Sequence, residues 1–375
     1  MKKVFFTENT KETKRMYKDA VKVLILGGGF CGASVAKVLQ RDPRLQVTLI
    51  DKTPYFEYSG SVPKLLTQPG YVKKLILPYE RFLKQTKLVT GEVTTVTPTF
   101  VETPQHSYGF DLLVISLGVD YPIYVENKHN VFTVAKCTDV LKRYEHITAA
   151  EHILIVGGGI TGTEVAGELA THYPAKKVCL IEADNRLLSR SPPRASFLAQ
   201  QFLQKHGVDL LLGEKVVKHQ NDSYVTNTGV TRKADVCIWC TGITPNPDYM
   251  RQFPDTIYAK NCALNLNDYL QLQGFPNIFV GGDITALDEE KTAHNAVDHA
   301  RVISQNIRRT LADRPLRKYT IDPEPLFVSL GNRKALYIGE NWAVTGFVPS
   351  LLKQSIETYF LHIWPQTVRS HIWYL

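Results

Sequence analysis

The chain has 375 residues, of which 44% are hydrophobic, and carries a formal net charge of +8. This length suffices for two or three domains with buried cores, and the composition excludes a disordered or fibrous protein. No run of about 18 apolar residues is present, so we expect no transmembrane helix. The opening sequence lacks the apolar block of a secretory signal peptide, which predicts an intracellular protein.

The cysteines and the basic charge limit the classes of partner. Six scattered cysteines without framework spacing indicate free thiols in a reducing compartment. Cys237 and Cys240 lie three positions apart in a predicted strand and therefore point to opposite faces, which favours two core thiols over a redox or metal pair. We predict no metal site. Because no zinc-finger spacing or RNA-binding motif accompanies the basic charge, nucleic acid is not the expected partner.

In chain order, short β-branched runs alternate with helical patterns, which is typical of parallel α/β sheets. These runs cover 21–28, 45–51 and 110–118 in a first unit and 152–158, 177–183 and 234–242 in a second. The internal repeat is therefore a whole nucleotide-binding unit. A further strand at 277–283 has no unit of its own, and we expect it to join the first sheet. From about Asp322, short strands and then a helical segment predict a small C-terminal domain.

Each unit places a glycine-rich turn between its first strand and the following helix. The glycines are Gly27, Gly29 and Gly32 in the first unit and Gly157, Gly159 and Gly162 in the second. The first glycine of such a turn permits a tight bend, the second lets a pyrophosphate approach the backbone, and the third allows close packing of helix and strand. The helix N-terminus then offers free N–H groups to the phosphates.

An acidic residue follows each turn. Asp51 and Glu182 end the next strands, about 20 positions after the last glycine, where a carboxylate hydrogen-bonds a ribose. Two bound dinucleotides are predicted. Since a nicotinamide and a flavin form a hydride donor and acceptor, whereas two nicotinamides do not, we expect NADH and FAD. Asp283 after the extra strand suits the flavin ribityl chain, which assigns FAD to the first unit, and Glu182 should repel the 2′-phosphate of NADPH.

These motifs resemble those of flavoproteins with two dinucleotide-binding domains, namely type II NADH dehydrogenases and apoptosis-inducing-factor relatives, and most of all the ferroptosis suppressor protein branch. The resemblance covers about residues 21–320 and includes GGGFCG, GGGITGTEVAGEL, IWCTGITPN, NIFVGGD and K-x-A-x-x-A-x-x-H-A at 291–300. It implies an FAD-dependent, non-proton-pumping NADH:quinone oxidoreductase. Two alternatives are a soluble NADH-dependent reductase of an electron-carrier protein and a redox-sensing interaction protein similar to apoptosis-inducing factor.

The resemblance also implies site residues. FAD contacts fall on Gly27, Gly29, Gly32, Asp51, Lys52, Gly118, Asp283 and Ala293, and NADH contacts on Gly157, Gly159, Gly162, Glu182 and Gly242. Glu164 matches a residue that orients the nicotinamide carboxamide, and the alternative is a solvated first-turn acid that favours the helix dipole.

The segment 291–307 should start a helix aimed at the flavin's pyrimidine edge, where its positive end would favour negative charge. Lys291, His294 and His299 are candidates for quinone protonation or substrate placement, and for each histidine a packing role is an equal alternative. His294 and Asp298 stand where type II NADH dehydrogenases usually have glutamines, which puts the transfer of their quinone pocket in doubt.

The stretch 53–70 lacks the C-x-x-x-x-C pair that disulfide reductases of similar fold place beside the flavin. Electrons therefore cannot leave through a dithiol at this site. Tyr55, Phe56 and Tyr58 offer aromatic surface instead, either near the flavin or in the core.

The C-terminal segment is expected to contact a membrane or a second subunit. Apolar residues recur at helical spacing at Val348, Leu351, Leu352, Ile356, Tyr359, Phe360 and Ile363, with Lys353, Gln354, Glu357 and Thr358 turned away. Trp342, Trp364, Trp373 and Tyr374 fit a membrane interface, on the cytoplasmic or the mitochondrial face. Packing of the stripe on the body or on a second copy in a homodimer is the alternative.

The expected fold class is α/β, with two Rossmann-like dinucleotide-binding domains, the FAD domain being discontinuous, and a small C-terminal α+β domain. The expected boundaries are 20–121 with 247–320 for the FAD-binding domain, 122–246 for the NADH-binding domain and 321–375 for the C-terminal domain.

Overall fold

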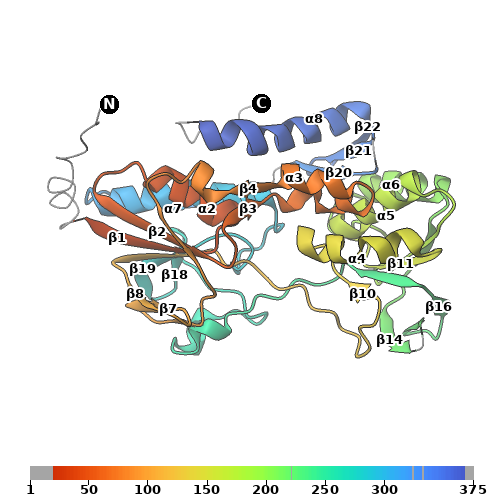
Figure 1. Cartoon of the computed structure of the whole chain (residues 1–375), viewed down its shortest axis with the longest axis horizontal. Coiled ribbons are helices and arrows are strands. Elements are labelled where there is room, and N and C mark those ends of the chain that lie inside the picture. Colours follow the sequence, from red (N-terminus) through yellow and green to blue (C-terminus); the bar gives the residue numbers. More distant parts are fainter. Residues whose placement is uncertain (1–19, 221, 323–324, 332, 368–375) are drawn as a thin grey trace, which may run out of the picture.

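A computed structural model describes residues 20–367 apart from residues 221, 323–324 and 332. Two parallel sheets with their helices lie side by side, and the C-terminal helix lies above both (Figure 1). No helix in the described part is long and apolar enough to cross a membrane. Trp373 and Tyr374, which were expected at a membrane interface, lie outside the described residues.

The first sheet has the strand order β18-β19-β9-β1-β2-β5. Its strands are β1 (Val21–Leu26), β2 (Leu45–Asp51), β5 (Lys87–Thr90), β9 (Leu112–Ile115), β18 (Gln271–Leu272) and β19 (Phe275–Val280). Strand β19 runs parallel to β9, with Ile278 opposite Leu113, so a segment from far along the chain completes this sheet. This confirms the discontinuous first domain. The central strands β1 and β9 are mostly apolar because hydrophobic clusters cover both faces of the sheet.

The second sheet repeats the layout in the order β10-β17-β11-β12-β13. Its strands are β10 (Val131–Phe132), β11 (His152–Val156), β12 (Lys177–Glu182), β13 (Asp209–Leu212) and β17 (Val236–Trp239). The fold class is therefore confirmed. The boundaries between domains at 121/122, 246/247 and 320/321 stay a prediction.

Helices and small antiparallel sheets complete both units. The helices are α2 (Phe30–Leu39), α3 (Val72–Leu75), α4 (Cys137–Ala149), α5 (Ile160–His172), α6 (Pro193–Lys205), α7 (Ala293–Thr310), α8 (Phe347–Thr358) and a 3₁₀ segment η1 (Ser59–Leu66). One small sheet pairs β3 (Tyr55–Glu57) with β4 (Ile76–Pro78). A second consists of β6 (Thr95–Val96), β7 (Phe100–Glu102) and β8 (Ser107–Gly109). A third consists of β14 (Val216–Gln220), β15 (Ser223–Thr226) and β16 (Thr231–Lys233). Helices α2 and α7 pack against each other beside the first sheet.

The C-terminal unit consists of a three-stranded sheet followed by α8. The strands β20 (Leu326–Ser329), β21 (Ala335–Ile338) and β22 (Ala343–Gly346) are antiparallel, as expected for an α+β unit. Figure 1 shows α8 lying across the upper face, above elements of both nucleotide-binding units.

Helix α8 does not have the single apolar stripe that we expected. Glu357 is buried and Lys353 is largely buried, so these two polar residues face the protein. Phe347, Val348, Leu351, Leu352 and Ile363 are exposed instead. Lys353 and Glu357 face inward because they find charged partners there, whereas Gln354 and Thr358 are exposed. The predicted stripe is divided, since Phe360 is buried and Ile356 is partly buried.

Glu357 fixes α8 to the first unit. Its carboxylate accepts hydrogen bonds from Ser61 and Tyr71 and pairs with Lys64 Nζ at 2.7 Å. Burial opposes the ionisation of Glu357, but Lys64, Ser61 and Tyr71 outweigh it and hold its pKa below the usual value. A depressed pKa means that the ionised carboxylate stabilises the folded state.

The stabilisation by Glu357 should depend on pH. Because its pKa is lower in the folded than in the unfolded chain, the contribution is complete above the unfolded pKa of about 4.3 and is lost as the pH falls through the folded value. We expect Glu357→Gln to lower the free energy of unfolding by about 2–4 kcal/mol at pH 7 and to match wild type in strong acid. Urea denaturation at several pH values checks this. The exposed Glu126→Gln serves as control, and a pH-independent loss for Glu357→Gln would contradict the assignment.

An aromatic cluster joins the end of the chain to the first unit. Phe30, Phe56, Tyr58, Phe360 and Trp364 contact one another with ring centroids 5.1–6.0 Å apart. Trp364 is fully buried, so its expected place at a membrane interface is wrong, whereas Trp342 is exposed. Phe56 packs in the core, while Tyr55 and Tyr58 also line the cavity described below.

Candidate active site

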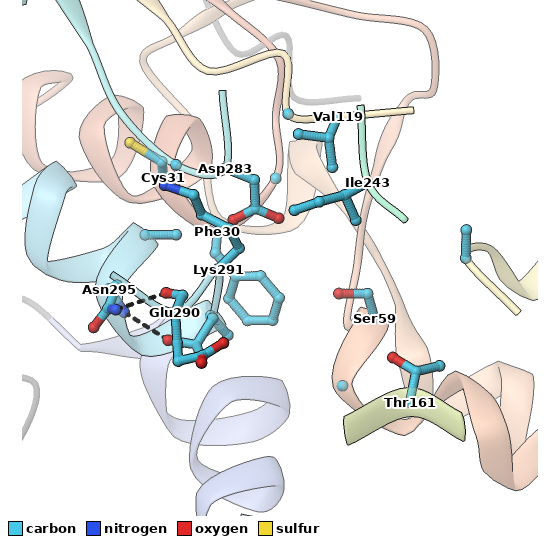
Figure 2. A pocket seen from close by; sticks show the side chains of 18 of the residues that line it. Phe30, Cys31, Ser59, Val119, Thr161, Ile243, Asp283, Glu290, Lys291 and Asn295 are labelled. Carbon is cyan, nitrogen blue, oxygen red and sulfur yellow. Dashed lines mark hydrogen bonds between the residues drawn. The ribbon is translucent and has the colours of Figure 1, made fainter. Parts of the chain in front are cut away.

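One large cavity of about 2480 Å³ opens between the two nucleotide-binding units. Its walls come from both glycine-rich turns, from the segment that leads into α7 and from α8. Figure 2 shows Phe30, Asp283 and Lys291 from the first unit on one side and Thr161 from the second unit on another. A cavity shared in this way can bring two ligands together.

The first glycine turn has the shape of a pyrophosphate cradle. A Cβ atom on Gly27 would lie 2.3 Å from the Ser116 carbonyl oxygen, and one on Gly32 would lie 1.9 Å from the Gly27 carbonyl oxygen. A Cβ on Gly29 would have nothing within 4 Å, because it would project into the cavity. The outer glycines thus serve close packing and the middle one leaves space for a ligand, as FAD requires.

The second turn repeats this geometry. A Cβ on Gly157 would meet Thr241 at 2.5 Å and one on Gly162 would meet the Gly157 carbonyl oxygen at 1.8 Å, whereas Gly159 again faces open space. The residues therefore fit a second dinucleotide in the same way.

The two acids are held by the turns that they follow. Asp51 accepts the N–H groups of Gly28 at 2.6 Å and Thr53 at 2.7 Å. Glu182 accepts the N–H groups of Gly158 and, at 2.8 Å, Asp184. Fixed carboxylates at the end of the second strand are suited to bind ribose hydroxyls.

The N-terminus of α7 forms a charged part of the wall. Thr292 caps the helix by accepting the Asn295 N–H at 3.2 Å. Lys291 Nζ donates to the carbonyl oxygens of Thr285 and Leu287, both at 3.0 Å, and burial lowers its pKa. Burial raises the pKa of Asp283, while Lys291 and His299 oppose that shift. The expected helix is present, and its positive end lies at the cavity.

The two candidate histidines occupy different environments. His294 lines the cavity and its Nε2 lies 3.7 Å from Asp298 Oδ2. His299 is 1% exposed and is not among the residues that line the cavity. The structure therefore brings Lys291 and His294 to the cavity and places His299 behind its wall.

Glu164 has a partner that sequence reasoning missed. It lines the cavity, is buried, and pairs with Lys353 Nζ of α8 while accepting the Ser329 N–H at 2.8 Å. It is therefore not a solvated first-turn acid. The two residues are 189 positions apart, so no local pattern could have shown the pair.

A second missed contact links the two units. Arg190, in the loop after β12, places its Nε 2.9 Å from Glu290 Oε1, and both side chains line the cavity.

Among the other expected site residues, the cavity is lined by Gly27, Gly29, Asp51, Lys52, Gly118, Gly159, Gly242, Asp283 and Ala293. Gly32, Gly157, Gly162 and Glu182 are not among the residues that line it.

The cysteines do not form a pair. All six are free, and Cys31 and Cys240 line the cavity while Cys237 is buried on the opposite side of its sheet. Within the described residues no group of His, Cys, Asp or Glu is placed to hold a metal ion.

The model of one protein family, the pyridine nucleotide-disulphide oxidoreductases, matches residues 21–300. The chain belongs to this family. It is 30% identical to ferroptosis suppressor protein 1 of Taeniopygia guttata, over 83% of this chain and 87% of that one. It is 29% identical to apoptosis-inducing factor homolog A of Dictyostelium discoideum, over 95% of this chain and 93% of that one. It is 24% identical to the type II NADH:quinone oxidoreductase of Staphylococcus aureus, over 92% of this chain and 96% of that one.

Among solved structures, the fold is similar to that of NDH2 from Plasmodium falciparum in complex with NADH. The TM-score is 0.81 at 17% identity, with 92% of this chain and 95% of that one covered. Family and cradle geometry together establish the chain as an oxidoreductase whose cofactors are FAD and NADH.

Proposed function

We propose that the protein oxidises NADH and reduces a quinone dissolved in a membrane. The observation that carries this proposal is the continuity of the cavity with the exposed apolar face of α8. Leu352 is 43% exposed on that face and also lines the cavity, together with Ile356, Tyr359 and Phe360. An apolar electron acceptor could therefore reach the cavity from the side of α8 along these apolar side chains.

The residues of the wall suit such a reaction. FAD, when bound, accepts a hydride from NADH and passes two electrons on. The α7 N-terminus and Lys291 stabilise negative charge at the cavity wall. Lys291 and His294 are the groups proposed to assist quinone reduction, which consumes protons, and Glu164 is proposed to orient the nicotinamide. The names of two relatives, a type II NADH:quinone oxidoreductase and a structure solved with NADH, support the assignment.

The function is tested by purifying the protein, recording its flavin absorbance and following NADH oxidation with and without a short-chain ubiquinone. We expect a yellow protein whose NADH oxidation rises at least tenfold with quinone, with NADPH as the poorer donor because Glu182 repels its 2′-phosphate. A yellow protein that reduces ferricyanide but gains nothing from quinone would contradict the proposal.

We also propose that α8 binds the membrane peripherally. Its exposed apolar residues Phe347, Val348, Leu351 and Leu352, together with Ile363 in the turn that follows, are suited to the interface of a bilayer. The triple variant Val348→Ser/Leu351→Ser/Leu352→Ser should float with liposomes at least tenfold less than wild type. Val217→Ser, which removes an equally exposed apolar residue of β14, should float normally. Equal flotation of the triple variant would show that this face does not bind lipid.

A further inference from the structure

His299 supports the backbone turn at Gly282, which lines the cavity, although the His299 side chain itself does not line it. Its Nδ1 accepts the N–H of Gly282 at 2.9 Å, and the ring is 1% exposed. Because the backbone N–H is the donor, Nδ1 must be unprotonated and the ring proton must reside on Nε2.

Glu289 fixes this tautomer. Its Oε1 makes a close polar contact of 2.7 Å with His299 Nε2, and neither atom has a hydrogen-bond partner among the described residues. Tyr319 donates its hydroxyl to the other carboxylate oxygen at 2.7 Å and packs its ring edge-to-face on His299. Burial opposes the ionisation of Glu289, but His299 and Tyr319 outweigh it and keep its pKa below the usual value.

The turn held by His299 aims Asp283 into the cavity. Gly282 has φ +81°, and a Cβ on Gly281 would lie 2.5 Å from Cys31 Sγ and 3.1 Å from His299 Cβ. The turn therefore packs tightly against the side of α7. Figure 2 shows the Asp283 carboxylate pointing into the cavity beside Phe30.

We propose that His299 is a positioning residue for FAD. The chain Tyr319–Glu289–His299 holds the Gly282 N–H, and thereby sets the position of the Asp283 carboxylate toward the cofactor. His299 acts through this backbone contact and exchanges no proton with the substrate. The inference depends on FAD as cofactor and is independent of whether the electron acceptor is a quinone.

Two side-chain replacements separate the contacts of the ring. His299→Asn keeps an acceptor near the position of Nδ1, whereas His299→Gln keeps a donor near Nε2 and loses the acceptor for Gly282. We expect His299→Gln to weaken FAD binding at least about tenfold, as an unpaired buried N–H implies. His299→Asn should bind FAD within about threefold of wild type and retain the pH profile of quinone reduction. Ser304→Ala removes another buried polar group of α7 and should change neither property.

FAD affinity is measured by titrating apoprotein with the cofactor, and folding by circular dichroism. Equal FAD affinity of the Gln and Asn variants, or weaker binding by Asn, would overturn the inference. It would also be overturned if His299→Asn bound FAD normally but lost more than about 100-fold in turnover together with one limb of the pH profile, because His299 would then be a proton donor. Failure of wild type to reduce quinone would refute only the proposed function, since FAD binding is read out separately.

Discussion

Replacing Gly29 by valine is expected to abolish FAD binding while the protein still folds. A Cβ atom at this position would meet no protein atom within 4 Å, and a side chain would enter the space of the cofactor's pyrophosphate. The backbone at Gly29 is extended, with φ −68° and ψ −162°, which valine adopts without strain. We expect a colourless protein with an FAD dissociation constant raised more than about 100-fold. Flavin absorbance after purification and after addition of FAD measures this loss.

The corresponding change in the second turn gives a matched comparison. Gly159→Val should leave the protein yellow, because Gly159 belongs to the other cradle, but should raise the concentration of NADH needed for half-maximal flavin reduction by more than about 100-fold. Gly70→Val, at an exposed glycine with open space around it, should behave as wild type. If Gly29→Val retained FAD, or if Gly159→Val lost it, the assignment of the two cradles would be wrong.

The second large effect is expected at the buried pair of Glu164 and Lys353. Their side chains are 8% and 17% exposed, so removing one partner leaves a buried charge without compensation. We expect Lys353→Met to lower the free energy of unfolding by about 3 kcal/mol. The double variant Lys353→Met/Glu164→Gln should recover most of this loss, because neither position then carries a charge. The coupling energy of the pair follows from a double-mutant cycle. Its four members are wild type, Lys353→Met, Glu164→Gln and the double variant, and urea denaturation gives the free energy of unfolding of each.

Activity separates the roles of the two residues. Since Glu164 lines the cavity and is proposed to contact the nicotinamide, the double variant should remain slow with NADH even where its stability is restored. A double variant that regains both stability and turnover would show that Glu164 only fixes α8. A single Lys353→Met variant as stable as wild type would contradict the energetic role of the pair.

Much of this arrangement could be predicted because it is local in sequence. The turns at Gly27 and Gly157 and the acids Asp51 and Glu182 follow fixed spacings within one β-α-β unit, and each acid accepts a backbone N–H of its own turn. Their roles in cofactor binding stay predictions. The return of residues 275–280 to the first sheet was also predictable, because an isolated apolar strand needs a sheet to join.

The orientation of α8 could not be predicted because long-range partners decide it. Helical periodicity identified its apolar residues correctly, but the burial of Lys353 and Glu357 depends on Glu164 and Lys64, each more than 180 positions away. The same holds for His299, whose burial depends on the turn at Gly282 and on Tyr319. The hydrophobic pattern shows which residues of α8 are apolar. The charges of Glu164 and Lys64 on neighbouring elements determine that Lys353 and Glu357 face the protein.

The aromatic cluster around Phe30 has a consequence for biosynthesis. Phe360 and Trp364 complete a core whose other members, Phe30, Phe56 and Tyr58, leave the ribosome some 300 residues earlier. The first nucleotide-binding unit therefore cannot finish its packing until residues 360–364 have been synthesised. Stop codons shortly before Phe360 should then yield a nascent protein that chaperones and proteases recognise as unfinished, however complete its glycine turns are.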